Sequence, residues 1–200
     1  MDFASFFSSF KVFDLVVILF LAAMFVVGYA QGAIRRAAGL LSITFAFFLS
    51  AVLSVPIGNF LAQNWTYYKF EYSQMIGFLV PFVAAVVALA LVVQGTYTKQ
   101  EIFAKYPVFD EILGGLLGVC YAALLLLFVT IILDQYYLNV PTAPNNEALG
   151  FLRSFWNILN ESSTGNFLHT HVIPPFVGFF SILLPQYIQA TYALTFRAIA

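Results

Sequence analysis

Four long stretches of the chain contain almost no charged residues, and they restrict its fold more than any other feature. A helix needs about 20 mainly apolar residues to cross the hydrocarbon core of a bilayer. The runs that reach or approach this length are residues 12–34, 37–55, 73–95 and 112–133. Because lipid cannot satisfy backbone hydrogen bonds, each run must satisfy its own, and the sequence predicts four transmembrane helices.

The composition supports the same interpretation. Only 8% of the residues are charged and 62% are hydrophobic, whereas charged residues make up about 25% of a typical soluble domain. Eight basic and nine acidic side chains could not cover the surface of a soluble fold of 200 residues. The net charge of −1 excludes strong overall electrostatic attraction to nucleic acid or anionic lipid. We therefore expect an all-α integral membrane protein, forming one membrane domain over residues 1–200 in contact with the lipid bilayer.

Turn-forming residues separate and follow the apolar runs. Pro56 and Gly58 are predicted to end the second helix, and the stretch NVPTAPNNE at 139–147 cannot remain helical at its prolines. Residues 162–196 contain no Asp, Glu, Lys or Arg, but prolines leave no uninterrupted apolar piece longer than nine residues. For residues 134–200 we predict an external region with short interfacial helices or a re-entrant hairpin, and no fifth span.

The stretch GYAQGAIRRAAGLL joins the first two runs and contains the only adjacent pair of basic residues. Gly28 and Gly32 are four residues apart, so on a helix they share one face and let another backbone approach closely. Arg35 and Arg36 follow, and their heads could reach water and lipid phosphate. We interpret the stretch as a tight helix-to-helix connection with a charged anchor. A flexible link with two ordinary arginines is the alternative.

The fourth run begins with a similar pattern, DEILGGLLGV. Asp110, Gly114, Gly118 and Ala122 follow one another at intervals of four, which leaves one helix face nearly free of side chains over three turns. Asp110 lies near the start of this helix, where the macrodipole favours a negative charge. We expect a helix-packing face that begins with a capping carboxylate.

Asp14 is the one ionisable residue that could lie at membrane depth. A charge near the bilayer centre costs at least about 2.5–3.5 kcal/mol, so a charged residue tolerated there is a candidate for a relay or substrate role. Asp14 follows Lys11 by only three residues, however. The alternative interpretation is a carboxylate at the membrane boundary that caps the start of the first helix.

Motifs of soluble enzymes and metal sites are missing from the sequence. Nucleotide-binding glycine loops, G-x-S-x-G, H-E-x-x-H and C-x-x-C do not occur. His169 and His171 are the only histidines, and no third ligand is spaced to complete a metal site with them. Cys120, the only cysteine, is expected to be a packing residue inside an apolar helix. We expect no metal, no cofactor and no enzymatic activity.

Together these landmarks resemble the colicin V production protein (CvpA) family. The resemblance rests on Asp14, on GYAQGAIRRAAGLL, on FDEILGGLLGVCYAALL and, more loosely, on VIPPFVGFFSILLP. The positions that match are Asp14, Gly28, Gly32, Arg35, Asp110, Gly114 and Gly118. The chain departs from the family where further basic residues are usual, at Val27, Ala30 and Gln31, and has Glu111 and Ala122 in place of the usual Arg and Gly.

The resemblance implies an inner-membrane protein linked to colicin V production or export and to envelope homeostasis. With no catalytic set in view, the first hypothesis is a non-enzymatic factor that scaffolds or modulates a membrane complex, through a membrane-protein partner or self-association. The alternative is a small transporter or channel, with a polar path lined by Asp14, Gln31, Gln94 and Asp110. An intramembrane enzyme is a third possibility, weakened by the lack of paired catalytic groups.

Basic residues near the ends of the spans give the orientation, because they favour the cytoplasmic side. The first and third links carry four, and the opposite side carries two: Arg35, Arg36, Lys99 and Lys105 against Lys11 and Lys69. This count favours an N-terminus and a C-terminal tail outside the cytoplasm. If Arg153 and Arg197 of the tail are also counted, the two sides carry equal numbers of basic residues. The family resemblance extends to four-helix domains that anchor certain periplasmic serine proteases. In those proteins the protease domain follows the fourth helix, which agrees with a tail outside the cytoplasm.

Overall fold

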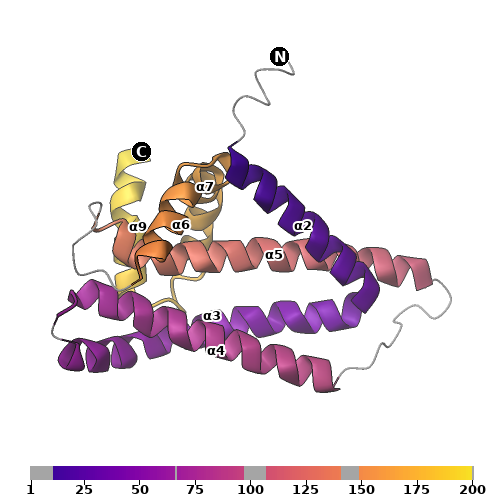
Figure 1. The fold of residues 1–200 in the computed structure, drawn as a ribbon, viewed down its shortest axis with the longest axis horizontal. Coiled ribbons are helices and arrows are strands. Elements are labelled where there is room, and N and C mark those ends of the chain that lie inside the picture. The colour runs from indigo at the N-terminus through magenta and orange to yellow at the C-terminus, as the bar shows by residue number, and fades with distance from the viewer. Residues whose placement is uncertain (1–10, 66, 97–106, 141–148, 200) are drawn as a thin grey trace, which may run out of the picture.

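The computed structural model describes residues 11–65, 67–96, 107–140 and 149–199, and this part of the chain is built from helices (Figure 1). Four helices are long and apolar enough to cross a membrane. They are α2 (Val12–Gln31), α3 (Ala33–Asn64), α4 (Phe70–Thr96) and α5 (Pro107–Tyr137). The prediction of an all-α membrane protein with four spans is therefore confirmed.

Shorter helices follow the four spans. They are α6 (Gly150–Asn160), α7 (Ser163–Phe167), the π-helical turn η1 (Leu168–Val172), α8 (Ile173–Phe179) and α9 (Gln186–Ile199). We refer to α6–α9 as the C-terminal lobe. Figure 1 shows α2 slanting across α5, with α3 and α4 on the other side of α5 and the lobe around its C-terminal half.

The second span is longer than the sequence predicts. Pro56 and Gly58 do not end it, because α3 continues through both residues to Asn64. Close packing against α4 supports the helix at this point: a Cβ atom added to Gly58 would lie 2.9 Å from the Cα of Gln74, and one on Gly77 would lie 2.7 Å from the Gly58 nitrogen. Proline is tolerated in membrane helices where neighbouring helices hold the backbone, so Pro56 does not end α3.

The turn between α2 and α3 consists of a single residue, Gly32. Its φ of 80° is the one positive φ among the residues that the structure describes, and such a conformation favours glycine. A Cβ atom there would also lie 2.7 Å from Oδ2 of Asp110. Glycine is therefore required at this position both by the backbone and by its neighbour.

Helices α2 and α5 contact each other backbone to backbone. A Cβ atom on Gly114 would lie 2.6 Å from the carbonyl oxygen of Gly28, and one on Gly118 would collide with the carbonyl oxygen of Met24. Ala122 continues the same face and is fully buried. The small residues singled out in the sequence thus face one another inside the chain, and we call this contact the glycine seam.

Large aromatic side chains fill the space between α3, α4 and α5. The ring of Phe47 stacks on that of Phe128, with centroids 4.1 Å apart and planes 12° apart. Phe78 and Phe82 of α4 complete the cluster, and all four side chains are buried. The outer faces of the spans remain apolar: Leu19 is 71% exposed, which suits contact with lipid.

Helix α8 of the C-terminal lobe packs against the aromatic cluster between the spans. The ring of Phe176 in α8 lies 6.0 Å from Phe47 and 5.8 Å from Phe128. The prolines of the lobe interrupt the helix less than predicted, because α7, η1 and α8 follow one another without a gap and Pro174 and Pro175 stand in the first turn of α8. The choice between interfacial helices and a re-entrant hairpin remains a prediction.

Candidate functional site

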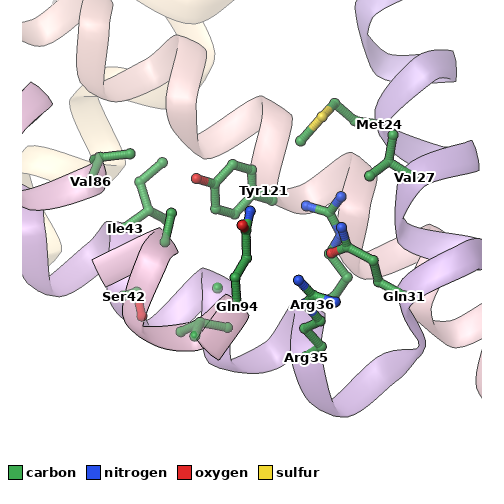
Figure 2. Close-up of a pocket in the computed structure, with 13 residues that line it drawn as sticks. Met24, Val27, Gln31, Arg35, Arg36, Ser42, Ile43, Val86, Gln94 and Tyr121 are labelled. Carbon is green, nitrogen blue, oxygen red and sulfur yellow. The ribbon is translucent and has the colours of Figure 1, made fainter. Parts of the chain in front are cut away.

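A cavity of about 270 Å³ lies between α2, α3, α4 and α5, close to the Gly32 turn (Figure 2). Its polar lining consists of Gln31, Arg35, Arg36, Ser42, Gln94 and Tyr121. Its apolar wall is formed by aliphatic side chains and Met24. We call it the arginine cavity, because it gathers both arginines of the stretch that joins the first two spans.

Arg36 is buried in this cavity. Its side chain is 7% exposed, and its guanidinium carbon lies 5.6 Å from the centre of the Tyr121 ring. The Nε atom of Arg36 has no hydrogen-bond partner. The expectation that both arginine heads reach water and lipid phosphate stays a prediction, and the structure shows that the Arg36 side chain lines the cavity. Arg35, the arginine singled out by the family resemblance, lines the cavity half-buried.

Asp110 lies beside the arginine cavity without lining it. It stands in the first turn of α5 and faces Gly32 of the α2–α3 turn. Its carboxylate is fully buried, and neither oxygen has a hydrogen-bond partner. An unpartnered polar group costs free energy when it is buried, so Asp110 is the least satisfied acidic side chain that the described residues contain.

Asp14 lies at the other end of α2, where it joins the first span to the lobe. Its Oδ1 accepts hydrogen bonds from the backbone nitrogen (2.9 Å) and hydroxyl (2.7 Å) of Thr164. Its Oδ2 accepts from the backbone nitrogens of Lys11 (3.0 Å) and Ser163 (3.3 Å). The carboxylate therefore stands at the start of both α2 and α7, where free N–H groups and the macrodipole favour negative charge.

The residues proposed for a transport path do not come together. A helix rises 1.5 Å per residue, so Asp14 lies about 27 Å along α2 from the Gly32 turn that Asp110 faces. Gln31 and Gln94 line the arginine cavity, and neither aspartate does. The cavity therefore offers cationic and amide groups and no carboxylate.

A second polar cluster surrounds Asp134 near the end of α5. Its fully buried carboxylate accepts hydrogen bonds from Nε1 of Trp156 (2.7 Å), the hydroxyl of Tyr192 (2.6 Å) and Nε2 of His169 (2.9 Å). The three donors come from α6, α9 and η1. This single carboxylate therefore holds three segments of the lobe on the last turns of α5.

Both ring nitrogens of His169 face acceptors. Nε2 meets the Asp134 carboxylate, and Nδ1 lies 2.9 Å from the carbonyl oxygen of Gly165. An imidazole ring can donate from both nitrogens only when it is protonated. Burial of the ring opposes protonation, but the hydrogen bond to Asp134 and its negative charge outweigh this and raise the pKa of His169 above its ordinary value.

Sequence reasoning assigned Arg36 only to a charged anchor and did not single out Asp134, although signals existed for the buried role of both. Arg36 stands 7 residues before Ile43 and 14 before Ser50, both buried, which places all three on one helix face. An acidic residue near a helix C-terminus opposes the macrodipole, so Asp134 needed partners from elsewhere. Cys120, by contrast, was expected to pack and is exposed.

No group of three His, Cys, Asp or Glu side chains among the described ranges could hold a metal ion.

The model of one protein family, described as "Colicin V production protein", matches residues 13–154. The matched region contains all but the first residue of α2, the whole of α3–α5 and the start of α6, and with them the arginine cavity and all three buried aspartates. Comparisons with curated proteins and with solved structures found no match.

The His169–Asp134 contact should make stability depend on pH. A raised folded pKa means that the stabilisation is complete below the unfolded pKa, near 6.5, and is lost as pH rises through the folded pKa. We expect His169→Gln to lower the melting temperature of the full chain at about pH 6 more than at about pH 9, measured by thermal unfolding in detergent.

His171→Gln is the matched control, since His171 is exposed and stacks on Phe167, with ring centroids 5.3 Å apart. It should leave the melting temperature near the wild-type value at both pH values. Equal losses of melting temperature in His169→Gln at the two pH values would show that the charged pair does not form.

Proposed function

The chain belongs to the colicin V production protein family, and we propose that it is a non-enzymatic factor that scaffolds or modulates a membrane complex used for colicin V production or export. The family assignment supports a role in colicin V production. Four candidate spans make the chain a multi-pass membrane protein. We place it in the bacterial inner membrane and extend its role to envelope homeostasis.

The way the lobe is attached carries this proposal. Asp14 and Asp134, two of the three buried carboxylates, have their oxygens engaged by donors from the lobe. Side chains that are fully engaged in holding helices together are poorly suited to carry protons or substrates. The result is a lobe fixed to the membrane bundle at two points, which favours a structural platform over a transport path through these residues.

The glycine seam also limits how partners can bind. Gly28, Gly114 and Gly118 are occupied by contacts between α2 and α5, so they are not free for self-association through close helix packing. A partner or second copy would use other surfaces, such as the exposed apolar residues of the lobe. Phe179 and Ile182 are 81% and 96% exposed.

Orientation can be tested with reporters on two links, both outside the described residues. We propose that the N-terminus and the C-terminal tail face the periplasm, on the basis of the four-to-two count of basic residues. A reporter fused after Asn145 should be active outside the cytoplasm, and one placed within 100–104 should be active inside. An Asn145 reporter found wholly in the cytoplasm would reverse this orientation.

Colicin V secretion tests the scaffold itself. In a colicin V-producing strain that lacks its own family member, the wild-type chain should restore toxin release, measured as growth inhibition of a sensitive lawn. Asp134→Ala should reduce release to the empty-vector level, because losing one member of a buried charged cluster costs about 3–5 kcal/mol and frees the lobe. Asp110→Asn should retain wild-type release, since Asp110 has no hydrogen-bond partner to lose.

Immunoblots of the membrane fraction ensure that variants are compared at equal abundance. Asp134→Asn keeps one acceptor oxygen and should lie between Asp134→Ala and wild type. Full release with Asp134→Ala would contradict the scaffold. Loss of release with Asp110→Asn would favour a transport role for the Asp110 carboxylate at the Gly32 turn.

A further inference from the structure

We propose that the arginine cavity binds a phosphate-bearing anion, which the guanidinium groups of Arg35 and Arg36 recognise. The proposal concerns a ligand site and does not depend on the scaffold role. The phosphate could belong to a lipid headgroup or to a free phosphate compound, and the chemistry of recognition is the same for both.

The first argument is charge. Arg36 is more than nine-tenths buried and retains a buried Nε without a hydrogen-bond partner. No carboxylate is among the residues that line the cavity, and no ion pair joins either arginine to an acidic residue within the described ranges. A buried cation without a counter-ion is costly. An anion in the cavity would compensate it, and the guanidinium fork suits phosphate oxygens.

The second argument is the donor set around the arginines. Gln31 comes from the end of α2, Ser42 from α3 and Gln94 from the end of α4, so three helices contribute to the polar lining. Figure 2 shows Gln31 and Gln94 turned toward the same space as the arginine side chains. Amide and hydroxyl donors can bind the phosphate oxygens that the two guanidinium groups leave unbound.

The third argument is the mixed character of the cavity lining, which adds apolar side chains to the polar groups. Beside the polar groups of the same helices, the lining includes Met24, Val27, Val86, Ala90 and Val93. A volume of about 270 Å³ lies just below the usual range of ligand pockets. It suits a phosphate with a short attached group, such as a lipid headgroup whose acyl chains leave along the apolar wall.

Calorimetric titration of the full chain in dodecyl maltoside tests the proposal with three probes. These are dihexanoyl phosphatidylglycerol, the zwitterionic dihexanoyl phosphatidylcholine and inorganic phosphate. Saturable binding of phosphatidylglycerol alone would show that the bound phosphate belongs to a lipid headgroup. Binding of inorganic phosphate as well would identify a free phosphate site. Absence of saturable binding with both anionic probes would overturn the proposal.

Variants link any binding to the cavity. Arg36→Gln should weaken the affinity for the bound anion about tenfold or more, because a hydrogen bond to a charged group contributes about 1.5–3 kcal/mol. Lys69→Gln is the matched control: it removes one positive charge from the α3–α4 link, away from the cavity, and should leave the affinity unchanged.

Equal affinities in Arg36→Gln and wild type would also overturn the proposal, because binding would then occur elsewhere. If Arg36→Gln does not fold, judged by its thermal unfolding, Arg35→Gln replaces it, since Arg35 is only half-buried and its loss should perturb the fold less. The same tenfold weakening is expected for that variant, and unchanged affinity contradicts the site.

Discussion

The backbone contact between α2 and α5 is the interaction on which the rest of the structure depends. Lipid is as apolar as the side chains of a membrane helix, so it gives helices little hydrophobic reason to associate. Close packing must supply the attraction instead, and Gly28, Gly114 and Gly118 allow two backbones to touch. This contact holds the Gly32 turn against Asp110.

The buried charges divide into two groups with different consequences. Asp14 and Asp134 are surrounded by donors, and they join the C-terminal lobe to the spans. Asp110 and Arg36 lie near the opposite end of α2 and keep buried polar atoms without partners. The Asp14 and Asp134 carboxylates join parts of the framework, whereas Arg36 lines the cavity for which we propose an anion, and Asp110 stays outside that cavity.

Much of the fold could be predicted from the sequence, since uninterrupted apolar runs of span length leave few alternatives in lipid. The glycines at intervals of four indicated a packing face, and the structure pairs those of α2 with those of α5. The end of α3 could not be predicted, because packing of Gly58 on α4 outweighs the local effect of Pro56. The position of Asp134 near a helix end indicated that it needs partners, but their identity could not be predicted, since they lie 22, 35 and 58 residues away along the chain.

A double-mutant cycle tests the register of the α2–α5 contact most directly. A Cβ atom on Gly115 would lie 2.7 Å from the Phe25 ring, so Gly115→Ala should destabilise the wild type but not a Phe25→Ala background. We predict a coupling energy of about 0.5–3 kcal/mol, from the unfolding free energies of the four proteins in detergent. Gly95→Ala is the control, because a Cβ atom on Gly95 would have no atom within 4 Å. Its change in unfolding free energy should add to that of Phe25→Ala. Additivity of Gly115→Ala and Phe25→Ala within about 0.5 kcal/mol would contradict the α2–α5 contact.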